Sequence, residues 1–226
     1  LDRGIAMPGG EADQVGRWLL DIALFLAEAG APRLDELRAL CIRMLADGLT
    51  PTSHVTRALA KPYIGKKATG LCGAHFFYEA EYAAIVRGNW SASVKMATWR
   101  TSVYAGINRL NRKGWHISDG QLILRTTGEE YAESVIPTMD WDRLTGITRA
   151  DGFRIPHESM GHSAFSAGAE TKDGKRMCCG VDFSIRRPDD QCEIAARKNW
   201  FFLDDAIVAT GSNIWTTAPV VQETII

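Results

Sequence analysis

Residues 100–120 carry the side chains best suited to chemistry on a polar ligand, and composition does not explain their order. The stretch reads RTSVYAGINRLNRKGWHISDG. The amide of Asn111 can donate hydrogen bonds to hydroxyl or carboxylate oxygens, and the ring of Trp115 can stack on a sugar face. Each of these residues also has a structural interpretation. Asparagine is common in turns, and the indole of a Gly-Trp turn can be buried. Arg100 and Tyr104 can bridge the edges of a sandwich.

The spacing of this stretch resembles a motif block of polysaccharide lyase family eight, the hyaluronate, chondroitin AC and xanthan lyases. That block reads Arg, three residues, Tyr-Glu, two residues, Asn-Gly-Glu-Asn, two residues, Gly-Trp, then Asp-Gly three residues on. The following positions match it without a gap: Arg100, Tyr104, Asn108, Asn111, Gly114, Trp115, Asp119 and Gly120. Ala105 and Leu110 depart from it, because they stand where the family has glutamates.

Three further segments extend the resemblance in the same order along the chain. Residues 81–96 resemble the strand pair that precedes the block, and residues 137–148 resemble a segment that runs from Pro-Thr to Pro-Gly-Thr-Thr. Residues 196–214, ARKNWFFLDDAIVATGSNI, resemble the family's strand-turn-strand signature and are the most specific match. The two aspartates of that signature are interpreted as turn residues.

The N-terminal DRGIAMPGG resembles the family's Gly-Arg-x-Ile-Ser-Arg-Pro-Gly stretch. In the register that also keeps the Pro-Gly pair, Arg3 takes the place of the first arginine and Met7 that of the second. A surface arginine near a mobile terminus is the competing interpretation of Arg3.

The resemblance implies cleavage of a uronic-acid polysaccharide by β-elimination, in which a base removes the C5 proton and the C4 oxygen leaves. In the family a tyrosine is the base, an asparagine and a histidine bind the carboxylate, and an arginine tunes the tyrosine. The resemblance places this tyrosine, histidine and asparagine upstream of the chain. It implies catalytic roles for Arg3 and Asn111 and substrate-binding roles for Trp115 and Arg100. The implied partners are an acidic polysaccharide and the rest of the lyase helical domain, and neither a cofactor nor a metal is expected.

Two other functions compete with a lyase. Met7, Leu110 and the missing tyrosine favour a non-catalytic glycan-binding or scaffold segment. A glycoside hydrolase would need paired carboxylates about 5 to 10 Å apart, and the acidic residues between positions 129 and 142 stand in no recognised pairing.

Bulk properties exclude several other classes of function. The chain has 226 residues, a formal net charge of −1 and a pI near 6.6, so neither a nucleic acid nor an anionic membrane surface is an expected partner. The 5 cysteines show no CxxC spacing, which predicts neither a disulfide framework nor a zinc site. The chain has no apolar run of about 18 residues and no signal-peptide core. The resemblance implies a secreted protein whose signal was removed upstream, with this chain as its central segment.

Two helices are expected at the start of the chain. Residues 11–30 show an amphipathic period, and residues 33–47 show a second one that ends before a glycine. The apolar positions of the first are Val15, Leu19, Ile22 and Leu26, widened by Trp18 and Phe25, and those of the second are Leu34, Leu37, Cys41 and Met44. Residues 1–50 are therefore assigned to the end of a helical domain, which the resemblance identifies as an α/α toroid.

An all-β region is expected after a linker. Residues 51–75 are rich in proline and glycine and are interpreted as the linker. Residues 76–226 then show short alternating stretches separated by turn residues, which predict an antiparallel β-sandwich that is incomplete at its C-terminus. The expected fold class is α+β, with a short helical segment followed by a large multi-sheet sandwich.

Overall fold

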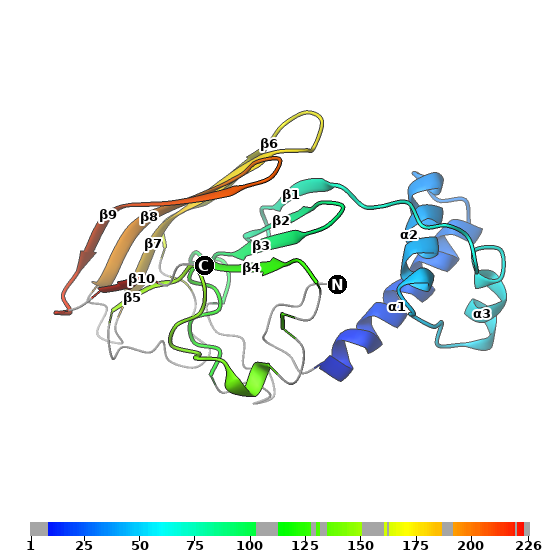
Figure 1. Ribbon diagram of the computed structural model, residues 1–226, viewed down its shortest axis with the longest axis horizontal. Coiled ribbons are helices and arrows are strands. Elements are labelled where there is room, and N and C mark those ends of the chain that lie inside the picture. Colours follow the sequence, from blue (N-terminus) through cyan, green and yellow to red (C-terminus); the bar gives the residue numbers. More distant parts are fainter. Residues whose placement is uncertain are drawn as a thin grey trace. The chain divides into compact units, whose positions relative to one another are not determined.

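The chain folds into helices followed by strands, in two separate compact units. The computed structural model describes residues 9–102, 113–127, 130–131, 135–150, 161, 163–186, 192–219 and 221–223. A helical unit ends at Gly70, and an all-β unit begins at Leu71 (Figure 1). The α+β class expected from the sequence is confirmed. Among the described residues, no helix combines the length and apolar character needed to cross a membrane.

The helical unit contains α1 (Gly9–Glu28), α2 (Leu34–Ala46) and α3 (His54–Ala60). The two long helices end close to where the sequence predicts. Gly30 and Gly48 follow them with φ of 68° and 85°, a conformation that glycine adopts at little cost. The buried side chains between the helices are Leu20, Ala23, Leu24, Cys41, Met44 and Ala60.

The apolar face that the periodicity of α1 singles out is not the face that its neighbouring helices cover. Ile22 and Phe25 belong to the expected stripe, yet they are 53% and 50% exposed. Leu20 and Leu24 are buried instead. Because α1 is apolar around most of its circumference, the helical period identifies the helix but not the side that packs. Within the described residues an apolar face of α1 therefore lies open.

The stretch 51–75, expected as a linker, contains α3 and the first residues of β1 (Gly73–Phe77). Helix α3 begins at a capping box. The hydroxyl of Ser53 accepts the backbone N–H of Thr56 at 3.1 Å, and the hydroxyl of Thr56 accepts the backbone N–H of Ser53 at 3.2 Å. This pair satisfies backbone donors that the short helix would otherwise leave open, so a helix forms despite the nearby prolines and glycines.

Replacing Ser53 with alanine is expected to lower the stability of the helical unit by about 1 kcal/mol, because the cap oxygen is lost. Chemical denaturation of the full-length protein followed by circular dichroism measures the change. Ser53→Asp is the matched control, since aspartate also accepts at an N-cap. An aspartate variant as destabilised as the alanine variant would contradict the assigned cap.

The all-β unit is built on two four-stranded antiparallel sheets. The first sheet has the order β1-β2-β3-β4 and adds to β1 the strands β2 (Tyr82–Val86), β3 (Ser91–Lys95) and β4 (Gln121–Arg125). The second contains β6 (Ser166–Glu170), β7 (Met177–Arg186), β8 (Cys192–Phe202) and β9 (Ile207–Thr216), in that order. A short pair joins β5 (Thr148–Ala150) to β10 (Val221–Glu223), and a 3-10 turn, η3, covers Ile136–Thr138.

The two four-stranded sheets pack face to face, as the layers of Figure 1 show. Their shared core joins Phe76, Ile85 and Val94 of the first sheet to Phe183, Trp200 and Phe202 of the second. Side chains along β7 alternate between buried and less buried positions, the period that a strand with one face on a core requires. The predicted antiparallel sandwich is confirmed.

Candidate functional site

The four candidate site residues divide into two groups. Arg3 and Asn111 lie outside the described residues, together with Met7 and Leu110. Arg100 and Trp115 lie within the all-β unit, so their surroundings can be described.

Arg100 follows strand β3 and bonds to the turn that joins β1 and β2. Its Nη2 donates to Oε1 of Glu81 at 3.0 Å and to the backbone oxygen of Tyr78 at 3.2 Å. Its side chain is 37% exposed. Arg100 therefore links the end of β3 to this turn, and part of its guanidinium still reaches the surface. Tyr104, with which the sequence analysis paired it, lies outside the described residues.

Glu81 is the residue that sequence reasoning missed. Its side chain is fully buried just before β2, and its φ of 51° is uncommon for any residue with a side chain. Besides Arg100, its carboxylate accepts the backbone N–H of Thr98 at 2.7 Å and the hydroxyl of Ser166 at 3.2 Å. The hydroxyls of Thr98 and Thr101 also donate to it. In the sequence, Glu81 is an acidic residue directly before an apolar strand, and this pattern does not predict that its carboxylate is buried among hydrogen-bond donors.

The carboxylate of Glu81 is held in its charged form. Burial acts to raise its pKa, but the hydrogen bonds from Thr101, Thr98 and Arg100 together outweigh burial, so the pKa lies below its ordinary value. The negative charge of Glu81 also interacts with Lys95. Burial lowers the pKa of Lys95 to about 8, while the charge of Glu81 acts in the opposite direction.

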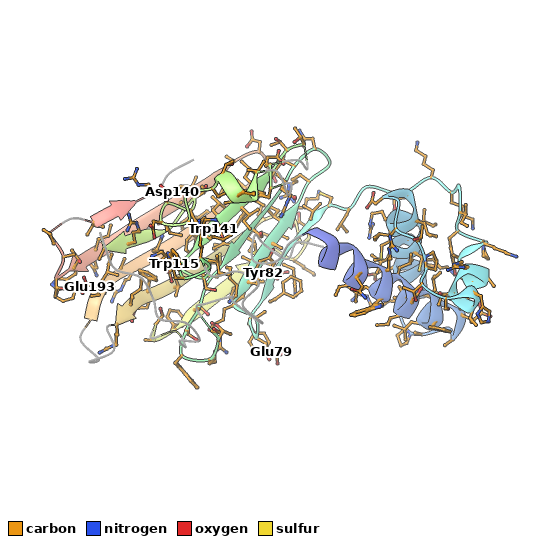
Figure 2. The ribbon with its side chains drawn as sticks, turned by 90° about the horizontal axis from the view of Figure 1, so that it is seen from below. Glu79, Tyr82, Trp115, Asp140, Trp141 and Glu193 are labelled. Carbon is orange, nitrogen blue, oxygen red and sulfur yellow. The ribbon has the colours of Figure 1, made fainter. Side chains whose placement is uncertain are left out.

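Two residues that adjoin Arg100 along the chain or through a backbone hydrogen bond have exposed aromatic side chains. Trp99 precedes it in the chain and is 66% exposed, and Tyr78, whose carbonyl accepts from Arg100, is 62% exposed. Tyr82, labelled in Figure 2, begins the strand that follows the same turn. A guanidinium can attract carboxylates and an exposed aromatic ring can stack on a sugar face, so residues of these types in one region suit an anionic sugar.

Trp115 is half-buried and lies between two clusters of core residues. Its Nε1 donates to Oδ1 of Asp142 at 2.9 Å, and its ring packs against both the sandwich core and a smaller cluster that includes Trp141 (Figure 2). The indole N–H is therefore engaged within the protein. This bond joins the Gly-Trp pair to the segment 137–148, so two of the stretches that carry the family resemblance are in contact in the folded protein.

The histidine of the same stretch is part of the core. His116 is completely buried, and its Nδ1 lies 2.8 Å from Oδ2 of the buried Asp119. Among the residues that the structure describes, none forms a hydrogen bond with the Nε2 atom of His116. Across the described residues, no group of three or more histidine, cysteine, aspartate or glutamate side chains is placed to hold a metal ion.

Comparison with known proteins agrees with this architecture. The family model described as polysaccharide lyase family 8, super-sandwich domain, matches residues 72–226. Chondroitinase-AC of Pedobacter heparinus is 29% identical over 150 residues, 64% of this chain and 20% of that protein. Xanthan lyase of Bacillus sp. strain GL1 is 31% identical over 177 residues, 76% of this chain and 18% of that protein.

A solved structure shows the same fold. The chondroitin AC lyase of Streptomyces coelicolor A3, determined in complex with chondroitin sulphate, superposes with a TM-score of 0.67 at 24% identity, covering 91% of this chain and 30% of that chain. The chain spans about a fifth of the length of the two curated relatives. Because the family model covers more than half of its residues, the chain belongs to polysaccharide lyase family 8.

Proposed function

We propose that the full-length protein cleaves uronic-acid-containing polysaccharides of the hyaluronan, chondroitin or xanthan type by β-elimination. The observation that carries this proposal is the match of the family model to residues 72–226. The names of the relatives, chondroitinase-AC and xanthan lyase, support it. A secreted protein is part of the same proposal.

The proposed reaction removes the C5 proton of a uronic acid and expels the oxygen on C4. The difficult step is carbanion formation, which becomes feasible when donors neutralise the adjacent carboxylate and a base stands at C5. Asn111 is proposed to donate to that carboxylate, and Arg3 to lower the pKa of the tyrosine that acts as the base. Arg100 and Trp115 are proposed to bind the substrate, Trp115 through its ring because its N–H is engaged by Asp142.

The open apolar face of α1 supports a proposed partner, the rest of the lyase helical domain. Trp18, Ile22 and Phe25 are each about half exposed there, at 51%, 53% and 50%. Apolar surface of this kind is stabilised when further helices remove it from water. We infer that additional helices of the same protein cover this face.

A non-catalytic glycan-binding or scaffold role is the second candidate. Leu110 favours it, because the family has a glutamate at this position to orient the arginine that tunes the base. Met7 favours it for a similar reason, since it replaces the second arginine of the N-terminal motif.

Incubation of the full-length protein with hyaluronan, chondroitin and xanthan separates the two candidates. A lyase creates a conjugated double bond, so ultraviolet absorbance is expected to rise on at least one of these glycans. The absence of new absorbance on all three would reject the lyase and favour the binding role.

Arg3→Ala and Asn111→Ala are each expected to lower kcat by about tenfold or more, since each removes a donor proposed to act on the developing charge. Arg17→Ala and Asn89→Ala are matched controls at exposed positions outside the proposed site. Equal kcat values for the test and control variants would remove Arg3 and Asn111 from the site.

A further inference from the structure

We propose that Glu81 is a positioning residue that fixes the guanidinium of Arg100 for contact with the carboxylates of an acidic glycan. This inference rests on the proposed function, because it names how that site recognises its substrate. It assigns no catalytic step to Glu81, which is buried and acts through Arg100.

The geometry gives Arg100 one defined position. Its Nη2 bridges Oε1 of Glu81 at 3.0 Å and the carbonyl of Tyr78 at 3.2 Å. An arginine has five N–H donors in a rigid planar fork, so fixing one nitrogen at two points fixes the plane of the whole group. Within the described part of the chain, no acceptor bonds to Nε or Nη1 of Arg100. Three N–H donors therefore remain for a ligand.

The position of Glu81 is fixed in turn by the segment that follows β3 and by the first residue of β6. Thr98 and Thr101, which flank Arg100, donate to the carboxylate, and Ser166 of β6 donates from the second sheet at 3.2 Å. The backbone of Glu81 is also tied down, because its oxygen accepts the N–H of Met96 at 2.9 Å. A carboxylate with this many donors has little freedom to move and resists protonation.

Such an arrangement favours binding by preorganisation. An arginine on an open surface loses rotamer freedom when it binds a ligand, and this loss weakens the complex. Here the fold has already ordered Arg100, so less freedom is lost on binding.

A double-mutant cycle tests whether Glu81 acts through Arg100. The full-length wild type is compared with Glu81→Gln, Arg100→Ala and the double variant on the glycan that it cleaves. Arg100→Ala is expected to raise KM by about tenfold and Glu81→Gln by about threefold, with kcat changed by less than about twofold. The double variant is expected to match Arg100→Ala alone, since Glu81 has nothing left to position.

Glu79→Gln is the control for the loss of one negative charge on the same turn. Glu79 is exposed, and the one bond that its carboxylate makes with a described side chain is from the hydroxyl of its neighbour Tyr78 at 3.1 Å. The KM of the Glu79→Gln variant is expected to equal that of the wild type. A rise in KM equal to that of Glu81→Gln would assign the effect to net charge and overturn the inference.

Two further outcomes overturn the inference. If Glu81→Gln raises KM by the same factor with and without Arg100, then Glu81 acts on the fold rather than on Arg100. If neither single variant changes KM, then Arg100 does not bind the glycan. Should Glu81→Gln fail to fold by circular dichroism, Glu81→Asp replaces it in the cycle, because it keeps the charge and shortens the reach to Arg100.

The proposed function can fail separately from this inference. If the wild type cleaves no acidic glycan, the dissociation constant for a hyaluronan hexasaccharide, measured by calorimetry, replaces KM in the same cycle. Coupled effects on that constant would support the role of Glu81 in a non-catalytic protein. If the wild type neither cleaves an acidic glycan nor binds the hexasaccharide, both the proposed function and the proposed role of Glu81 are overturned.

Discussion

Replacing Trp200 with alanine is expected to lower the free energy of unfolding of the all-β unit by about 3–5 kcal/mol. Trp200 is 1% exposed on β8 and belongs to the core that both four-stranded sheets share. The fit around it is close, since a Cβ added to Gly120 would lie 2.7 Å from its ring. The ammonium of Lys198 also lies 5.6 Å from the ring centroid. Truncation would leave a cavity and remove this partner from a buried cation.

Phe201 supplies the control for the Trp200 prediction, because it is the next residue on β8 and is 41% exposed. Neighbouring side chains of a strand point to opposite faces, so Phe201→Ala removes an aromatic ring without opening the core. Its cost is expected to be below about 1.5 kcal/mol. Chemical denaturation followed by circular dichroism compares the two variants. Equal losses would show that the shared core does not depend on Trp200.

Several strands of the sandwich were predictable because they carry a local signal. Residues 177–186 alternate between apolar and other side chains, and this period of two is a property of neighbouring residues alone. Strand β4 (Gln121–Arg125) carries a different local signal, a short run of three apolar residues between two polar ones. Glycines that follow the two long helices gave equally local signals for their ends.

Features that depend on distant residues were not predictable in the same way. The buried face of α1 depends on where α2 and α3 pack, and the helix is apolar on more than one side. The cluster around Glu81 joins residues 17 to 85 positions apart in the chain, from Thr98 to Ser166. The bond from Trp115 to Asp142 spans 27 positions. No periodic pattern encodes such contacts, so only the folded sheets reveal them.

Replacing Glu81 with alanine is expected to destabilise the all-β unit by about 3 kcal/mol. The change leaves Arg100 without its counterion and leaves the buried N–H of Thr98 without an acceptor. Glu81→Gln is expected to be milder, because the amide oxygen can still accept from Thr98 and from a hydroxyl. Chemical denaturation at neutral pH measures both variants. Equal stability of the alanine variant and the wild type would show that the cluster adds nothing to the fold.

The same carboxylate predicts how stability depends on pH. Because the pKa of Glu81 is lower in the folded protein than in the unfolded chain, its contribution is present above the ordinary glutamate pKa of about 4.3 and is lost as pH falls through the lower folded value. The wild type is therefore expected to lose stability below about pH 4 more steeply than Glu81→Gln, which cannot titrate there.

Asp204 also has a lowered pKa, from its exposed pair with Arg176. Solvent screens that pair, so Asp204→Asn is expected to change the slope less. Denaturation midpoints between about pH 3 and pH 7 compare the three proteins, and parallel curves for the wild type and Glu81→Gln would show that Glu81 titrates alike in the folded and unfolded chain.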